Sequence, residues 1–419
     1  MIVEGLEDWQ RRCNQDAEAR LLASTMPCDF SVTVDDDVLL CSVHDGQFIL
    51  RYVEEPDEVA DVNLVIPVRR WRQFIQTPPA PFYNTFNAML AHFRDVTVEG
   101  DHVKWAQSVG LIEAVLRLAR SGLSDAAGQG DSLAPGTIDD RFDVSTITGH
   151  YMNFHSRGQQ SVLYYEEAGQ GRPIVFLHTA GSDSRQYRYV LANAKLQEQW
   201  HMFAFDLPFH GRSDPGPKWW ETKYLLTTET YSDWVRDFVK HLELHRPVIV
   251  GSSMAGALVL YLAAEYGTEF SAAISLEGGF GTKGRYVPWT NHPMVHPGFF
   301  LQSWVRGLMA PQSPEEWQRL TLWQYAQGGP GVYQGDTYFY SVDWLKAGRH
   351  VGPAKCPLWI LTGEYDYSCT PEDGREAADR LVGIFIEMKG VGHFSMSENP
   401  LLFLRYISPI LEEILNSEW

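Results

Sequence analysis

The chain has 419 residues, a formal net charge of −19 at pH 7 and 44% hydrophobic residues. Its apolar content is sufficient for a packed core, which excludes wholesale disorder, and its length predicts two domains or one large domain with insertions. The acidic balance argues against nucleic acid or an anionic membrane as a partner, because both partners require basic patches.

Residues 1–125 form the first predicted domain, of the α+β class. Apolar and polar residues alternate in several short runs, which is typical of strands, and Asp45-Gly46 is a strong hairpin signal between two of them. The expected strands cover residues 31–34, 38–43, 47–53, 62–66 and 96–100, and the expected helices cover residues 68–77 and about 106–120.

This order of elements resembles the sterol-carrier-protein-like fold over about residues 20–120. The resemblance is carried by a strand that runs into Trp71 and Phe74, by the step Val98-Glu99-Gly100-Asp101, and by a closing amphipathic helix. Members of that fold can hold lipids in an apolar tunnel. A dimerisation or lid module is the alternative that we favour, because a fold does not determine a function. Residues 126–142, rich in Gly, Ser and Asp, then predict a linker.

Strands and helices alternate from residue 143 onward. The strands are expected at residues 161–166, 173–177, 202–205, 248–250, 272–276, 357–361 and 384–388. A helix is expected at about 228–243, and a final helix is capped by Asn399 and opened by Pro400. This alternation predicts a doubly wound, mostly parallel sheet with helices on both faces, formed by residues 143–277 and 351–419.

Residues 247–256 predict a buried strand, a tight turn and the start of a helix. Ser253 lies in the turn, with Gly251 two residues before it and Ala255 two residues after it. Small neighbours are needed there, because larger side chains would collide with the strand and the helix beside a strained turn. The alternative is a glycine-rich phosphate loop, and this stretch alone does not exclude it.

Further motifs in a fixed order make residues 145–419 resemble the α/β-hydrolase superfamily. Ser253 lies where that family has its nucleophile elbow, and residues 206–213 resemble its Asp-x-x-Gly-x-Gly-x-Ser stretch, with Phe209 where a glycine is usual. Asp366 follows a strand as the family's acid does, and His393 follows the last strand as the family's histidine does. The resemblance therefore implies a catalytic triad of Ser253, His393 and Asp366.

A serine hydroxyl needs a base within hydrogen-bond reach, and that base needs a third group to orient it. His393 would take the Ser253 proton, and Asp366 would hold the other ring nitrogen. Glu277 is an alternative acid, because it ends the strand after the elbow. Ser252 neighbours Ser253 but lies at the wrong point of the elbow to be the nucleophile. We expect structural or pocket roles, and not the role of base, for His210, His292, His296 and His350.

An oxyanion hole is expected from backbone N–H groups near Ser253. Met254 offers one at the helix start. The resemblance implies Ala180 as the second, in the loop that follows the strand at 173–177. Thr179 replaces the family's glycine in that loop, so its hydroxyl is a further candidate, and His178 is expected to orient the loop.

Residues 278–350 interrupt the strand pattern and are crowded with aromatic residues. The resemblance implies that this segment, called the cap below, covers the serine. Most of its aromatic residues should pack the cap, and a few should line an apolar pocket. The expected substrate contacts are His178, Phe209, Trp289, Trp323 and Phe394.

Three functions remain open at this point. The first is a serine hydrolase of a carboxylic ester, lactone or thioester with an apolar or aromatic part. The second is a hydrolase of carbon–carbon bonds in diketone-like compounds, and the third is a ligand-binding protein on a hydrolase scaffold. A serine at the elbow, in place of aspartate, argues against epoxide hydrolase or dehalogenase chemistry.

The sequence shows neither metal-ligand spacing nor a dinucleotide fingerprint, so we expect no metal and no cofactor. Five cysteines without metal spacing are typical of reduced thiols, which favours the cytoplasm. The first residues resemble no secretory signal, and no run is apolar enough to span a membrane. We expect a homodimer to which residues 1–125 contribute, with a small apolar or aromatic molecule as substrate and neither nucleic acid nor membrane as a partner.

Overall fold

The computed structural model describes residues 5–53, 60–120, 142–282 and 284–417. The chain divides into two compact units. Unit 1 comprises residues 1–131 and 289–312, and unit 2 comprises residues 132–288 and 313–419. The predicted cap, residues 278–350, is therefore shared between the units. Most of the predicted linker, residues 126–141, lies outside the described residues.

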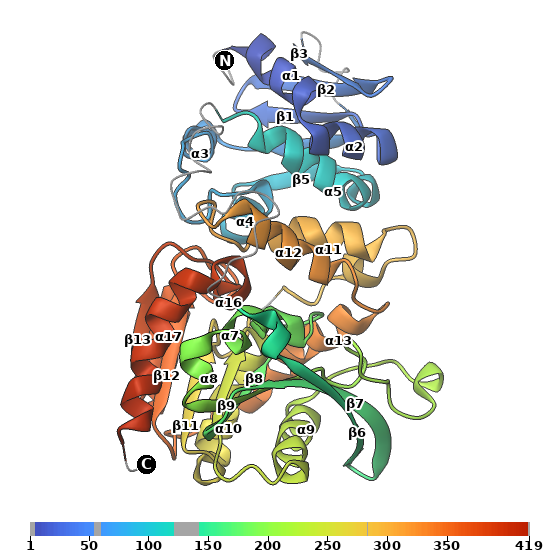
Figure 1. Cartoon of the computed structure of the whole chain (residues 1–419). Coiled ribbons are helices and arrows are strands. Elements are labelled where there is room, and N and C mark those ends of the chain that lie inside the picture. The colour runs from blue at the N-terminus through green and yellow to red at the C-terminus, as the bar shows by residue number, and fades with distance from the viewer. Residues whose placement is uncertain (1–4, 54–59, 121–141, 283, 418–419) are drawn as a thin grey trace. The chain divides into compact units, whose positions relative to one another are not determined.

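Unit 1 contains a mixed five-stranded sheet in the order β3-β2-β1-β4-β5 (Figure 1). Only β1 and β4 are parallel neighbours. The strands are β1 (Phe30–Val34), β2 (Asp37–His44), β3 (Gln47–Tyr52), β4 (Val62–Val65) and β5 (Thr97–Gly100). The helices are α1 (Leu6–Gln15), α2 (Ala17–Thr25), α3 (Val68–Phe74), α4 (Phe86–His92), α5 (His102–Arg117) and α11 (Pro297–Arg306).

All five predicted strands of this unit and both predicted helices are present, whereas α1, α2 and α4 were not predicted. The helix α5 begins earlier than expected because Asp101 caps it, accepting the N–H groups of Val103 and Lys104 at 2.9 and 3.0 Å. Helix α11 comes from the cap sequence and packs against α5, where the rings of Phe300 and Trp105 lie edge to face at 6.2 Å.

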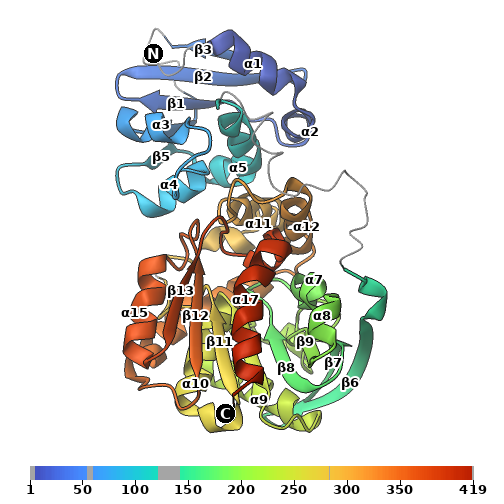
Figure 2. The same cartoon turned by 60° about the vertical axis from the view of Figure 1, so that its left-hand side comes forward.

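Unit 2 contains an eight-stranded sheet in the order β13-β12-β11-β10-β8-β9-β7-β6 (Figure 2). The six strands from β13 to β9 are parallel, and β7 and β6 continue the sheet antiparallel. The strands are β6 (Thr148–Ser156), β7 (Gln159–Ala168), β8 (Arg172–Leu177), β9 (Trp200–Phe205), β10 (Val248–Ser252), β11 (Ala272–Leu276), β12 (Leu358–Gly363) and β13 (Ile384–Met388).

Helices lie on both faces of this sheet, as alternating side chains show. Val248 and Val250 belong to the same buried cluster as Ile407 of α17, whereas Ile249 points to the opposite face. The helices of unit 2 are α7 (Arg188–Leu191), α8 (Ala194–Gln197), α9 (Thr228–His241), α10 (Met254–Glu265), α12 (Glu315–Tyr325), α13 (Val332–Tyr338), α14 (Trp344–Ala347), α15 (Pro371–Leu381), α16 (Ser395–Glu398) and α17 (Pro400–Leu415). The predicted doubly wound, mostly parallel sheet is confirmed.

Candidate active site

Ser253 lies on the tight turn between β10 and α10, at the carboxyl end of a central strand. Its backbone is strained, with φ 60° and ψ −117°. The neighbours must be small: a Cβ added to Gly251 would lie 2.6 Å from the carbonyl oxygen of Ala255, and one added to Gly256 would lie 2.3 Å from that of Leu276. The turn lifts the Ser253 side chain off the sheet edge and places it before the N-terminus of α10.

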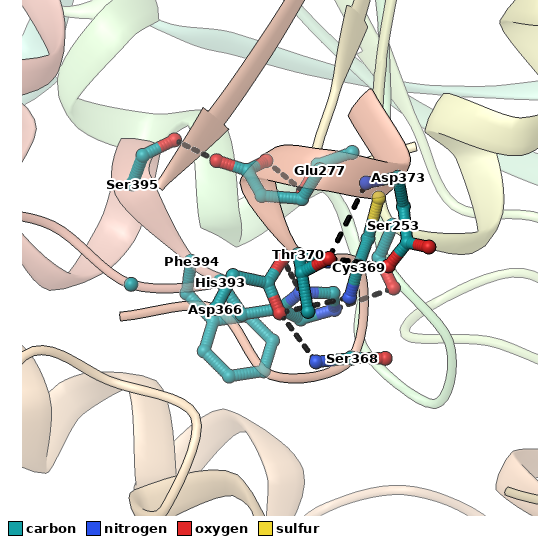
Figure 3. Close-up of polar contacts among 12 residues, drawn as sticks. Ser253, Glu277, Asp366, Ser368, Cys369, Thr370, Asp373, His393, Phe394 and Ser395 are labelled. Carbon is teal, nitrogen blue, oxygen red and sulfur yellow. Dashed lines mark hydrogen bonds and ion pairs between the residues drawn. The ribbon is translucent and has the colours of Figure 1, made fainter. Parts of the chain in front are cut away.

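Three side chains that are distant in sequence form one hydrogen-bonded chain (Figure 3). The Ser253 hydroxyl donates to Nε2 of His393 at 2.6 Å, and Nδ1 of His393 donates to Oδ2 of Asp366, also at 2.6 Å. Ser253 is 7% exposed, His393 3% and Asp366 0%, so these two hydrogen bonds are largely shielded from solvent. Such a relay is the arrangement that can activate a serine hydroxyl as a nucleophile.

The Asp366 carboxylate is held in one orientation by its own loop. Its Oδ1 accepts the backbone N–H groups of Ser368 at 2.7 Å and Cys369 at 3.1 Å, which leaves Oδ2 for His393. Figure 3 shows these contacts on one side of the carboxyl group. The loop therefore determines which oxygen faces the imidazole.

Glu277, the alternative acid, lies at the end of β11 and bonds elsewhere. Its carboxyl group accepts the hydroxyl of Ser252 at 3.0 Å. It also accepts the hydroxyl of Ser395 at 2.8 Å (Figure 3). Burial, followed by the nearby charge of Asp366, raises the pKa of Glu277 well above its usual range. Glu277 thus ties the elbow strand to the start of α16, and Asp366 is the carboxylate that contacts His393.

Glu398 supports the loop that carries His393 and was not singled out from the sequence. Its Oε1 accepts the N–H groups of Gly392 at 2.8 Å and Phe394 at 3.1 Å, on either side of the histidine. Its Oε2 accepts the hydroxyl of Ser313 at 3.0 Å, and the residue is fully buried. The only sequence signal was its position, five residues after His393.

The predicted oxyanion loop follows β8. The N–H and hydroxyl of Thr179 both donate to Oε1 of Gln186, at 2.9 and 3.0 Å, and the hydroxyl also contacts the Tyr325 hydroxyl. The Thr179 hydroxyl is therefore engaged within the protein. Among the described residues, the backbone N–H groups of Ala180 and Met254 have no hydrogen-bond partner, which leaves both available to an anion.

His178 anchors this loop to the next one. Its Nε2 accepts the N–H of Leu207 at 3.1 Å and its Nδ1 donates to the carbonyl of Thr179 at 2.9 Å. Burial, followed by the charge of nearby His210, lowers the pKa of His178 to about 4, so its ring is neutral near pH 7.

The other residues expected at the substrate lie in different surroundings. Phe394 follows His393, and its ring lies 5.4 Å from that of Tyr325. Phe209 stacks at 4.4 Å on Tyr224, with a φ of 75° that explains why glycine is usual there. Trp323 is 61% exposed, and Trp289 belongs to unit 1, where its ring meets that of Trp105.

A polar cavity of about 200 Å³ borders the oxyanion loop. Gly181, Phe209 and His210 contribute to its lining, together with Gln327 and Val332 from the cap sequence. Among the described residues, no group of three or more His, Cys, Asp or Glu side chains is placed to hold a metal ion. None of the helices in the described part of the chain has the length and apolar character needed to cross a membrane.

Comparisons with known proteins bear on the fold of unit 2. A family model described as alpha/beta hydrolase fold matches residues 172–336. The AB hydrolase superfamily protein YisY of Bacillus subtilis (strain 168) is 29% identical over 129 residues, which are 30% of this chain and 44% of that protein. The chain thus spans less than half the length of two curated relatives that it matches, 38% of one and 44% of the other.

Solved structures cover more of the chain. A thermophilic esterase from Thermogutta terrifontis, with malate bound, has a TM-score of 0.51 and 19% identity, over 64% of this chain and 100% of the other. An enol-lactonase from Burkholderia xenovorans LB400 has a TM-score of 0.52 and 18% identity over the same shares. The family match begins at residue 172, so the resemblance of residues 20–120 to sterol carrier proteins stays a prediction. Unit 2 of this chain has the α/β-hydrolase fold.

Proposed function

We propose that the chain is a serine hydrolase that cleaves a carboxylic ester, lactone or thioester of an apolar or aromatic small molecule. The observation that supports this most is the hydrogen-bonded series Ser253–His393–Asp366 on a strained strand-to-helix turn. The N–H groups of Met254 and Ala180 add two donors that have no hydrogen-bond partner among the described residues.

In the proposed first step, Ser253 Oγ attacks the substrate carbonyl carbon and its proton passes to Nε2 of His393. The Asp366 carboxylate stabilises the imidazolium that results. The carbonyl oxygen becomes an oxyanion, and the two backbone donors are expected to stabilise it by about 3 kcal/mol each. His393 then protonates the leaving alkoxide or thiolate, which leaves an acyl group on Ser253.

In the proposed second step, water enters and His393 takes one of its protons. The hydroxide attacks the acyl carbon, the second tetrahedral intermediate collapses, and His393 returns the proton to Ser253. The product is a carboxylic acid. No metal or cofactor is needed for either step.

The test combines a chemical probe with substitutions at two neighbouring serines. A fluorophosphonate should label the wild type at Ser253. Ser253→Ala should abolish the labelling and lower the turnover of p-nitrophenyl esters by several orders of magnitude. Ser252→Ala is the matched control and should keep the labelling, because Ser252 is bonded to Glu277 and not to His393. More than a tenth of wild-type activity in Ser253→Ala would contradict the proposal.

A panel of p-nitrophenyl esters, lactones and vinylogous diketones distinguishes the substrate classes. Preference for the diketones would favour carbon–carbon bond hydrolysis. An enzyme that binds panel members but turns over none would favour a binding protein on a hydrolase scaffold.

We also propose that the protein is a homodimer to which residues 1–125 contribute. Light scattering on the full chain tests this by measuring the mass of the particle in solution. The full chain is used and not a fragment starting at residue 140, because residues 289–312 belong to unit 1 and such a fragment would lack α5, against which they pack. A monomer mass at all concentrations would contradict it.

A further inference from the structure

Three successive N–H groups of the oxyanion loop have different fates. Thr179 donates its N–H to Gln186, and Gly181 donates its N–H to Oδ2 of Asp336 at 2.7 Å. Ala180, between them, has no partner for its N–H among the described residues. The loop is therefore held on both sides of the one donor that remains open.

The two anchors come from different parts of unit 2. Gln186 lies in the 3-10 turn Ser184–Tyr187, which closely follows the loop in the chain, whereas Asp336 lies on α13 in the cap sequence. Tyr333 lies one turn earlier on α13 and packs closely on Gly181. A Cβ added to Gly181 would lie 2.6 Å from the Tyr333 ring. Helix α13 therefore makes both a close packing contact and a hydrogen bond with the oxyanion loop, and both are at Gly181.

Asp336 is fully buried, and each of its oxygens has a donor. Besides Gly181, Oδ2 pairs with Nε2 of His210 at 2.8 Å, and Oδ1 accepts the hydroxyl of Tyr224 at 2.7 Å. Three segments that are distant in sequence thus meet at one carboxylate.

The charge of Asp336 is balanced locally. His210 faces an oxygen acceptor at each ring nitrogen, the carbonyl of Pro208 at 3.0 Å and Asp336, which is the pattern of an imidazolium. Burial alone would lower the pKa of His210, but the Asp336 carboxylate outweighs it and the pKa is raised. With His210 in the imidazolium form, the pair carries no net charge and does not oppose negative charge on a substrate oxygen, as a lone carboxylate would.

We propose that Asp336 is a positioning residue that couples the cap to the oxyanion hole: by holding the Gly181 N–H it orients Ala180, so that the hole is complete only while α13 is seated on the loop. This inference rests on the proposed function. It predicts that Asp336 acts on stabilisation of the tetrahedral intermediate and not on the binding of the ground-state ester.

The chain offers a matched control. Asp343 lies in the same part of the cap and also ties it to the core, but it accepts the N–H and hydroxyl of Thr228 at the start of α9. Each substitution, Asp336→Ala or Asp343→Ala, removes one carboxylate that hydrogen-bonds the cap to the core; Asp336 is buried and Asp343 is partly buried. Only the first reaches the oxyanion loop.

The experiment measures kcat and KM for p-nitrophenyl acetate, the inhibition constant of an aryl trifluoromethyl ketone, and the melting temperature. The ketone forms a tetrahedral adduct with a serine hydroxyl and therefore reports the oxyanion hole. Asp336→Ala should lower kcat about 10- to 100-fold with little change in KM, since it misplaces one donor without removing it. It should also weaken binding of the ketone by a similar factor. Asp336→Asn keeps an acceptor for the Gly181 N–H and should recover part of both losses.

Asp343→Ala should lower the melting temperature and leave kcat and the ketone affinity within about twofold. Equal losses of kcat in Asp336→Ala and Asp343→Ala, or a ketone affinity unchanged in Asp336→Ala, would overturn the inference. If Asp336→Ala does not fold, Asp336→Asn decides the question by the same two measurements. A wild-type protein that neither hydrolyses esters nor reacts with a fluorophosphonate at Ser253 would instead refute the proposed function.

Discussion

Asp366→Asn is the substitution whose outcome follows most directly from the hydrogen bonds of the site. The backbone N–H groups of Ser368 and Cys369 both donate to Oδ1 of Asp366, so the only oxygen of an asparagine amide must take that place. The amide NH₂ then faces Nδ1 of His393, which must become an acceptor. The imidazole proton moves to Nε2, and the ring can no longer accept the proton of Ser253.

The expected loss is large because the wrong tautomer removes the base altogether. A wrong tautomer in a Ser-His-Asp site costs about 10⁴-fold in kcat, equivalent to about 5 kcal/mol of transition-state stabilisation. Glu277→Gln is the comparison. The two serine hydroxyls donate to different oxygens of Glu277, so a glutamine keeps an acceptor for one of Ser252 and Ser395 and can donate its amide N–H to the hydroxyl oxygen of the other. The carboxyl group that it replaces has a pKa raised by burial. Its loss should stay within about tenfold.

Initial rates of p-nitrophenyl acetate hydrolysis and the rate of fluorophosphonate labelling at Ser253 measure both effects. Circular dichroism and the melting temperature check that each variant is folded. The reasoning is refuted if Glu277→Gln loses more activity than Asp366→Asn, which would make Glu277 the acid. It is also refuted if Asp366→Asn keeps more than a tenth of wild-type kcat.

Three further predictions concern the supports of the site and the stability of unit 1. Glu398→Ala frees the N–H groups on both sides of His393 and should lower kcat by roughly 10- to 100-fold, whereas Glu398→Gln should recover most of it; equal rates in both variants would exclude this positioning role. Gly251→Ala forces a Cβ against the backbone of Ala255 and should lower the free energy of unfolding by about 1–3 kcal/mol, measured in urea; an unchanged midpoint would contradict the elbow packing. Burial raises the pKa of Glu113 to about 7, above its value of 4.5 in an unfolded chain, so the folded state binds more protons and stability falls as pH rises from about 4.5 to 7. Urea titrations across this range should show that the free energy of unfolding of the wild type falls by up to about 3 kcal/mol because of Glu113, and that this fall is absent in Glu113→Gln.

The sequence by itself determined the sheet and the place of the candidate nucleophile. Continuous apolar runs predicted the buried parallel strands, and the small residues on either side of Ser253 predicted the strand-to-helix turn. These features are local: a buried strand needs a short apolar run, and a strained turn needs small neighbours within three residues. The order of Ser253, Asp366 and His393 then indicated which side chains should meet, although their catalytic roles stay predictions.

The tertiary structure decided which carboxylate contacts His393 and what holds the loops. Asp366 and Glu277 both follow parallel strands, and only the fold shows that one bonds to the imidazole and the other to two serine hydroxyls. Asp336 and Gly181 are 155 residues apart, and no local pattern in the sequence pairs them. Helix α11, read as part of a cap, packs against α5 in unit 1. Periodicity indicates which face of a helix is apolar but not which surface covers it, because that choice is made by long-range packing and the burial of polar groups with their partners.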